Sequence, residues 1–175
     1  MSIRNDVSEI LYTEEKLQEI VQAMGRRITE DYQGKNLFLV SVLKGSLIFM
    51  ADLMRAIDLP CAIDFLSASS YGAGTTTSGE VRILKDLDST LEGRDVLVVE
   101  DILDSGVTLS FLLKNLSARQ PRSIRLCTLL DKPERRLVLK IIDAKDHISE
   151  DTSLDSFISG FRLAWRLSAE LNHYD

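Results

Sequence analysis

Hydrophobic residues in the first third of the chain follow a helical spacing. After Thr13, a residue type that caps helix N-termini, they recur at intervals of three or four positions: Leu17, Ile20, Val21, Met24 and Ile28. This spacing predicts an amphipathic helix that begins at Thr13. A second helical pattern begins at Gly45 and runs to Ile57, after which Pro60 prevents its continuation.

Short, nearly continuous hydrophobic runs alternate with these helical segments and predict buried strands. The runs cover residues 36–42, 62–68, 81–84, 95–99 and 123–130, and a further helix is predicted from about residue 107 to 118. Strands that alternate with helices are typical of a doubly wound, mostly parallel α/β sheet with helices on both faces. Ligands of such sheets bind beyond the carboxyl ends of the strands, so chemistry is expected there.

Length and composition are those of one folded domain. The chain has 175 residues, of which 45% are hydrophobic and 27% charged, and it contains no linker-like stretch and no internal repeat. We therefore expect a single domain over residues 1–175. No apolar stretch approaches the roughly 20 residues of a membrane span, and the N-terminus has no signal-peptide pattern, so a cytoplasmic protein is expected.

Charge and cysteine content exclude two further classes of protein. Lys plus Arg number 21 against 27 Asp plus Glu, a net charge of −6, which is the wrong sign for gripping a nucleic-acid backbone. An anionic ligand therefore needs backbone amides, a few placed cations or a metal. Cys61 and Cys127 lie in apolar runs and are expected in the core, with neither a disulfide nor a metal site built on them.

The most informative segment is residues 98–109, VVEDILDSGVTL, in which a hydrophobic strand runs through acidic residues into a helix start. At a helix N-terminus the free backbone amides of residues such as Ser105, Gly106 and Val107 converge on one point. The hydroxyls of Ser105 and Thr108 add further donors. This arrangement predicts a cradle for a monophosphate.

Three acidic residues accompany the cradle. Glu100 and Asp101, at the strand end, are suited to hold ribose hydroxyls or hydrated Mg²⁺, and Asp104 is placed to act as a base. The alternative is an ordinary strand-to-helix turn in which Asp104 or Ser105 caps the helix and the other acids are solvated. A dinucleotide site is excluded, because the G-x-G-x-x-G pattern is missing.

This segment resembles the phosphoribosyltransferase signature, and other motifs match the bacterial hypoxanthine-guanine phosphoribosyltransferases in order and spacing. These motifs are residues 43–45 (LKG), 69–72 (SSYG), 85–88 (KDLD), 92–97 (EGRDVL) and 130–136 (LDKPERR). Together they cover about residues 10 to 136. So many motifs in register make the resemblance highly specific.

The resemblance implies a fold, an activity and partners. The fold is the type I phosphoribosyltransferase fold, with a small hood formed by the N-terminal part and about residues 137–175. The activity is transfer of 5-phosphoribose from phosphoribosyl pyrophosphate to a ring nitrogen of a 6-oxopurine, hypoxanthine or guanine, with release of pyrophosphate. It requires Mg²⁺, and members of the family are dimers or tetramers.

The resemblance also assigns roles to residues of this chain. Lys44 and Gly45 would meet pyrophosphate, with the peptide bond before Lys44 in the cis form. Glu100 and Asp101 would take the ribose and the metal. Asp104 would be the general base on the purine.

Two loops complete this assignment. Residues 104–108 would enclose the 5′-phosphate. The polar loop of residues 69–79 resembles the lid of the family, with Ser70 and Tyr71 at its working end, and a lid excludes water from a reactive ribose centre. The alternative for this stretch is a merely flexible connection between strands.

Beyond the last of these motifs the match deteriorates, and this part of the family binds the base. A gapless count back from residues 156–161 puts Lys145 where the family has its Lys for the purine 6-oxo group, with Lys140 as a rival. The same count puts Asp151 where a stacking aromatic residue belongs. Asp155 falls on a position suited to a second metal contact.

The divergence leaves two functional classes open. Near the C-terminus, Ala169 or Glu170 occupies the position of a pyrophosphate-contacting Arg in the family. An active purine salvage transferase with an altered hood is favoured by Asp104, Lys44 and the lid. A non-catalytic phosphoribosyl-binding or nucleotide-binding protein, acting as a regulatory or scaffold subunit, is favoured by the missing aromatic residue and Arg.

Overall fold

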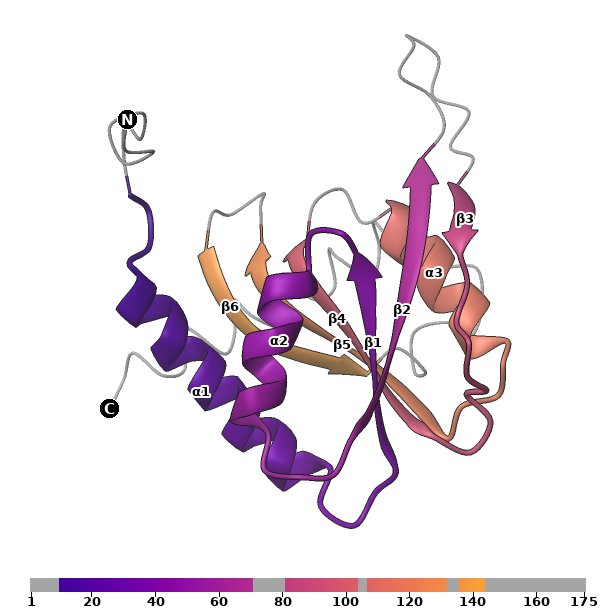
Figure 1. The fold of residues 1–175 in the computed structure, drawn as a ribbon, viewed down its shortest axis with the longest axis horizontal. Helices are drawn as coiled ribbons and strands as arrows, with labels where there is room; N and C mark the ends of the chain where they lie inside the picture. The colour runs from indigo at the N-terminus through magenta and orange to yellow at the C-terminus, as the bar shows by residue number, and fades with distance from the viewer. Residues whose placement is uncertain (1–9, 71–80, 104–106, 132–135, 144–175) are drawn as a thin grey trace, which may run out of the picture.

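A central sheet flanked by helices forms the part of the chain that the computed structural model describes, residues 10–70, 81–103, 107–131 and 136–143 (Figure 1). In chain order the elements are α1 (Glu14–Asp31), β1 (Leu37–Leu43), α2 (Leu47–Ala56), β2 (Ala62–Ser70), β3 (Val81–Lys85), β4 (Asp95–Leu103), α3 (Val107–Ser117), β5 (Ser123–Asp131) and β6 (Arg136–Asp143). Within these ranges no helix combines the length and the apolar character needed to cross a membrane.

The six strands lie in the order β3-β2-β1-β4-β5-β6. The four inner strands are parallel, and the two edge strands, β3 and β6, are antiparallel to their neighbours. The predicted α/β class with a mostly parallel sheet is therefore confirmed. α1 opens as predicted, because the Thr13 hydroxyl accepts a hydrogen bond from the Lys16 amide at 3.3 Å.

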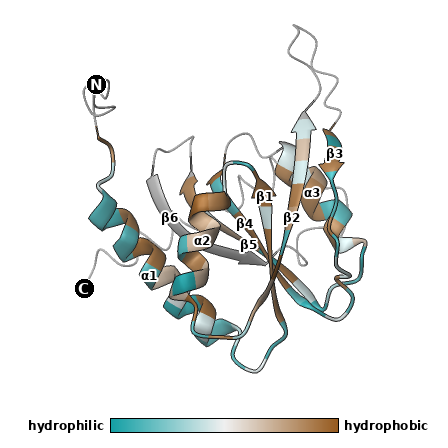
Figure 2. Cartoon of the chain, in the orientation of Figure 1, coloured by the Kyte–Doolittle hydropathy of each residue, from teal (hydrophilic) through white to brown (hydrophobic). Residues whose placement is uncertain are grey.

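Helices cover both faces of the sheet. In β1, Phe38 and Val40 pack on the side of α3, whereas Leu37 and Leu39 pack on the side of α1 and α2. Such alternation explains the continuous hydrophobic runs, because both faces of an inner parallel strand are buried. Each fully buried leucine contributes about 1.5–3 kcal/mol. Figure 2 shows these hydrophobic strands, and along α1 the polar and hydrophobic residues alternate.

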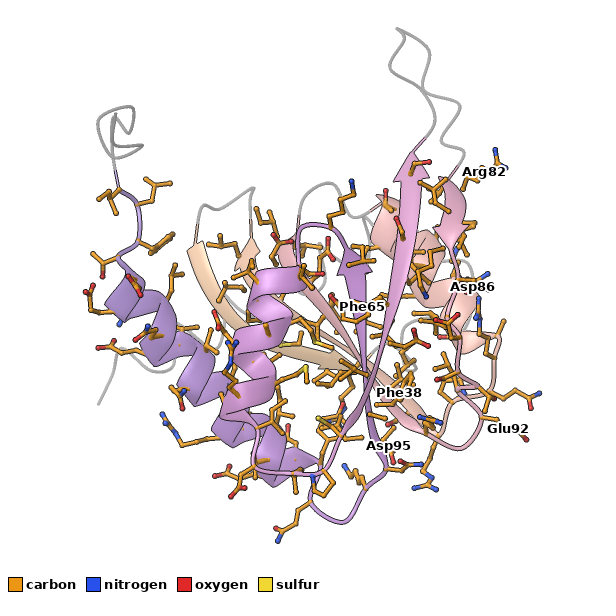
Figure 3. All side chains as sticks on the ribbon, viewed as in Figure 1. Phe38, Phe65, Arg82, Asp86, Glu92 and Asp95 are labelled. Atoms are coloured by element: carbon orange, nitrogen blue, oxygen red, sulfur yellow. The ribbon has the colours of Figure 1, made fainter. Side chains whose placement is uncertain are left out.

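Asp95 ties together the amino ends of three strands (Figure 3). Its side chain is buried and accepts hydrogen bonds from the Asn36 amide at 3.2 Å, the Arg122 guanidinium at 3.2 Å and the Ser123 hydroxyl at 2.8 Å. These donors precede or begin β1 and β5. These hydrogen bonds help to fix the register of β1, β4 and β5 relative to one another, and so also the relative positions of their carboxyl ends.

The largest boundary difference concerns β4, which was expected to end at Val99. It continues to Leu103, because its pairing with β5 continues through Ile102 and Leu103. Glu100 and Asp101 consequently lie within the strand and not beyond its end.

Three further differences from the sequence prediction exceed one residue. Ser69 and Ser70 were assigned to the polar loop, but they belong to β2, because they pair with β3. α2 begins at Leu47 and not at Gly45, because residues 44–46 form a turn. Residues 137–143, expected in the hood, lie in the edge strand β6, which the sequence analysis missed. Residues 144–175 of the expected hood, and residues 1–9 of the N-terminal part, lie outside the described ranges.

Candidate active site

The carboxyl ends of β1 and β4 form the topological switch point of the sheet. These strands are neighbours, but the chain packs α2 on one face after β1 and α3 on the other face after β4. Ligands of open α/β sheets bind beyond such a point. Lys44 and Gly45 follow β1 here, and Glu100 and Asp101 occupy the last part of β4. The fold therefore brings together two motifs that are far apart in the sequence.

The turn after β1 is exposed at this end of the sheet. Its first peptide bond, Leu43–Lys44, is cis, which agrees with the resemblance. Lys44 and Gly45 are both exposed. A lysine and the backbone of a turn that is open to solvent form a suitable contact for an anionic ligand.

Gly45 lies directly against the Asp101 carboxylate. A Cβ atom built on Gly45 would lie 3.0 Å from Asp101 Oδ1 and 3.1 Å from Oδ2, which is tighter than ordinary van der Waals contact. The Asp101 carboxylate is also held by the Ile102 amide, which donates to Oδ1 at 3.0 Å. The turn after β1 and the acidic end of β4 thus form one surface.

Glu100 has a different environment from Asp101. Successive residues of a strand point to opposite faces, so Glu100 and Asp101 leave β4 on different sides. Glu100 Oε2 is buried and has no hydrogen-bond partner among the described residues. Burial, and to a smaller extent the neighbouring Asp101 charge, raises the pKa of Glu100 to about 8. A buried carboxylate oxygen without a partner is suited to receive a hydroxyl donor or a cation.

The carboxyl groups at this strand end suit one particular mode of Mg²⁺ binding. Carboxylate oxygens are the ligands that Mg²⁺ prefers, and the last part of β4 offers one on each side, Glu100 Oε2 and the Asp101 carboxylate. The described residues contain no cluster of three His, Cys, Asp or Glu side chains that would enclose a metal. Mg²⁺ commonly binds through one or two carboxylates together with substrate phosphates, and the residues here fit that mode.

The predicted phosphate cradle is described only in part. Val107 and Thr108 begin α3, directly after the carboxyl end of β4, and Thr108 is half-buried. The position of α3 agrees with the expectation of a helix N-terminus at this end of the sheet. Asp104, Ser105 and Gly106 lie outside the described residues.

The other predicted site residues fall mostly outside the described ranges. The backbone of Ser70 ends β2, and Lys140 is in β6 at the edge of the sheet. Tyr71, Lys145 and Asp155 are among the residues that the structure does not describe. Their assigned roles remain predictions.

A groove of about 590 Å³ between α1 and α2 opens onto the candidate site and was missed by the sequence analysis. Leu17 and Ile48 contribute to its walls, and Gly45 and Asp101 lie in its lining. The amphipathic pattern of α1 was legible in the sequence. That pattern shows an apolar face, but it does not show how far two helices stand apart.

Comparison with known proteins is consistent with this geometry. The family model described as phosphoribosyl transferase domain matches residues 6–165. The chain is similar to a hypoxanthine-guanine phosphoribosyltransferase of Mycobacterium avium, with 53% identity over 75% of this chain and 68% of the relative. It is 49% identical to the protein of the same name from Streptococcus agalactiae serotype V, over 92% of this chain and 87% of the relative.

Similarity extends to solved structures. A crystal structure of a hypoxanthine phosphoribosyltransferase from Staphylococcus aureus superposes with a TM-score of 0.72 at 47% identity, over 79% of this chain and 76% of that one. The motifs, the sheet topology and these relatives agree. The chain belongs to the phosphoribosyltransferase family, within its group of hypoxanthine-guanine phosphoribosyltransferases.

Proposed function

We propose that this protein is a purine salvage enzyme that transfers 5-phosphoribose from phosphoribosyl pyrophosphate to a ring nitrogen of hypoxanthine, with guanine as a second base. The observation that carries the proposal is the packing of Gly45 against Asp101. This contact joins an exposed turn suited to pyrophosphate with carboxylates suited to ribose. Relatives named hypoxanthine-guanine phosphoribosyltransferase support the choice of bases.

In the proposed reaction, the bond from ribose C1′ to pyrophosphate breaks and a bond from the purine nitrogen to C1′ forms. The proton on that nitrogen passes to Asp104. Positive charge develops on the ribose as pyrophosphate leaves, much as in glycosidic cleavage, so water must be excluded. Ser70 and Tyr71, at the end of a closing lid, would exclude it.

Binding is divided among the remaining groups. Lys44 and Gly45 would hold pyrophosphate, Glu100 and Asp101 would hold the ribose hydroxyls, and residues 104–108 would hold the 5′-phosphate. Separate subsites for the two ends of the substrate orient C1′ between them. Such positioning lowers the barrier by removing translational and rotational freedom in advance.

Mg²⁺ belongs to the proposal, with Glu100 and Asp101 as its protein contacts and Asp155 as a further one. The chemistry that Mg²⁺ supplies when bound is neutralisation of charge on the leaving pyrophosphate. Glu100 Oε2, which has no hydrogen-bond partner in the described part of the chain, supports this assignment. Burial raises the pKa of Glu100, and a bound cation would favour its charged form.

A cytoplasmic location and self-association into a dimer or tetramer complete the proposal. α2 exposes Ile48 and Leu47, with 71% and 45% of their surface accessible, and self-association would remove such apolar area from water. Light scattering coupled to gel filtration measures the oligomeric state.

The decisive experiment incubates the protein with Mg²⁺, phosphoribosyl pyrophosphate and one base at a time, and follows nucleotide formation by chromatography. Hypoxanthine is expected to yield a nucleoside monophosphate, and adenine to react at least about 100-fold less efficiently. Omission of phosphoribosyl pyrophosphate is the matched control. If calorimetry detects binding of phosphoribosyl pyrophosphate but no base yields nucleotide, the non-catalytic alternative replaces this proposal.

A further inference from the structure

Two buried serines lie beneath the exposed turn at Lys44. Ser41, in β1, and Ser46, just before α2, are both fully buried, and their hydroxyl oxygens are 2.7 Å apart. The Ser46 hydroxyl donates its single proton to the Val42 carbonyl at 2.5 Å. Ser41 must therefore be the donor in the bond between the two serines. The resulting chain of hydrogen bonds runs from Ser41 through Ser46 to Val42.

Ser46 does not perform the usual role of a serine at a helix start. It occupies the N-cap position of α2, where a serine hydroxyl ordinarily accepts a hydrogen bond from a first-turn amide, but it makes no such bond. Its hydroxyl is directed back across the turn to β1. α2 therefore lacks the side-chain cap that contributes about 1 kcal/mol to the stability of a helix. The hydrogen bond across the turn therefore replaces the cap.

The backbone hydrogen bond inside the turn is long. This bond, from the Leu47 amide to the Lys44 carbonyl, is 3.4 Å long, against a usual length of about 2.9 Å. Lys44 and Gly45 are exposed. The Ser46 hydroxyl instead connects the two ends of the turn, at Val42 and Ser46, through a part-buried hydrogen bond, and burial strengthens such a bond electrostatically.

We infer that Ser46, supported by Ser41, positions the Lys44–Gly45 turn for pyrophosphate. This inference rests on the proposed function, because it takes the turn to be the pyrophosphate subsite. Neither serine touches the ligand; each acts through the backbone of the turn. The pair is thus a positioning element beneath the pyrophosphate subsite.

The test compares two ligands that use different subsites. Titration calorimetry with pyrophosphate and Mg²⁺ reports on the turn, whereas inosine monophosphate reports on the 5′-phosphate and base subsites. S46A is expected to weaken pyrophosphate binding about tenfold, since a buried hydrogen bond and a carbonyl partner are lost, and to change nucleotide binding less than about twofold. S41A leaves the bond from Ser46 to Val42 in place and is expected to weaken pyrophosphate binding about two- to threefold.

A matched control is available in α3. The Ser117 hydroxyl is buried but has no hydrogen-bond partner among the described residues, so S117A removes a buried hydroxyl remote from the turn. It is expected to leave both affinities unchanged. A purely structural role of Ser46 would lower the melting temperature and change both affinities equally, and that result would overturn the inference. If S46A does not fold, a loss in S41A confined to pyrophosphate supports the inference, and an equal loss for both ligands overturns it.

The proposed function and this inference fail in distinguishable ways. A wild-type protein that binds pyrophosphate but forms no nucleotide contradicts the proposed function, while the comparison of S46A with wild type still decides the role of Ser46. A wild-type protein that binds no pyrophosphate overturns the assignment of the turn, and the inference with it.

Discussion

The Cα atom of Gly45 faces the carboxylate of Asp101, and a side chain at position 45 would begin 3.0 Å from Asp101 Oδ1. The absence of a side chain at Gly45 is therefore what allows the turn after β1 to approach the end of β4. In the proposed enzyme this approach sets the distance between the pyrophosphate and ribose subsites. The spacing depends on one contact that the sequence alone does not reveal.

Replacing Gly45 with alanine tests this contact. The added methyl must displace the Asp101 carboxylate or the turn by a few tenths of an ångström. A misplacement of 1 Å can cost about 100-fold in rate, so for this smaller shift kcat/KM for phosphoribosyl pyrophosphate is expected to fall about 3- to 10-fold in G45A. Steady-state kinetics measure this, and the melting temperature is expected to change little because the site is exposed.

Gly34 provides the matched control for G45A. It has a φ of 73° and nothing within 4 Å of an added Cβ, so G34A strains the backbone without any steric contact. G34A is expected to lose about 1 kcal/mol of stability and to retain wild-type kinetics. Wild-type kinetics in G45A as well would show that the Asp101 carboxylate can move without consequence.

Asp64 joins β2 to the segment between β3 and β4. Its buried carboxylate accepts hydrogen bonds from the backbone amides of Phe65, Asp88 and Ser89 at 2.7, 2.8 and 3.0 Å, and Lys85 Nζ lies 3.7 Å away. Burial by itself raises the pKa of Asp64, but the amide donors and Lys85 outweigh this effect and hold the pKa below its usual value. D64N is expected to cost about 2–3 kcal/mol at pH 7, because an asparagine cannot accept all these bonds.

The same carboxylate gives the D64N effect a defined pH dependence. Because the pKa of Asp64 is lower in the folded protein, its stabilisation is fully present above the unfolded pKa of about 4 and is lost as pH falls through the folded pKa. The stability difference between wild type and D64N should therefore shrink in acid. Urea unfolding between pH 7 and about pH 3 measures it, with the exposed Asp58→Asn as control. A constant difference across this range would contradict the role of the charge.

The inner strands were predictable because a strand that is buried on both faces requires a continuous run of hydrophobic residues. The extension of β4 through Glu100 and Asp101 was not predictable. These residues are polar, and they belong to the strand because β4 pairs with β5, a segment distant in the sequence. β6 was missed for a related reason. Its residues form an edge strand whose ladder depends on β5, and no local pattern signals that partner.

The site was predictable as a set of residue types but not as a geometry. The resemblance of the motifs pointed to Lys44, Gly45, Glu100 and Asp101 as candidates, and the fold brings their segments together at the ends of β1 and β4. Ser46 would pass for an ordinary helix cap in the sequence. Its diversion to Val42 depends on the path of the turn, which only the structure contains.

Asp104 lies outside the described residues, and its proposed role as general base is testable by substitution. D104N keeps the size of the side chain but removes the basic oxygen, so turnover is expected to fall on the order of 10²–10⁴-fold. The affinity for phosphoribosyl pyrophosphate, measured by calorimetry, is expected to remain near that of wild type. D58N again serves as the control for loss of one negative charge. Unchanged turnover in D104N would remove Asp104 from the mechanism.

Recognition of the base is the last prediction, and it concerns Lys145, with Lys140 as second choice. A Lys ammonium donates to the 6-oxo group of hypoxanthine, whereas the amino group of adenine offers no acceptor at that position. β6 pairs Lys140 with Thr128, and Thr128 pairs with Glu100 in β4. The backbone of Lys140 is thus two strand spacings, about 10 Å, from that of Glu100. Lys145 lies outside the described residues.

The two lysines are separated by measuring kcat/KM for hypoxanthine relative to adenine in K145A and K140A. Loss of the lysine that binds the 6-oxo group should lower this ratio at least about 100-fold, because a site built to bond one group discriminates strongly against its absence. The exposed Lys114 of α3 supplies the control, since K114A removes the same charge far from the site. A ratio that falls only in K140A would show that Lys140, in β6, binds the 6-oxo group. If both variants keep the wild-type ratio, neither lysine reads the base, and the alignment of residues 137–156 that placed them is wrong.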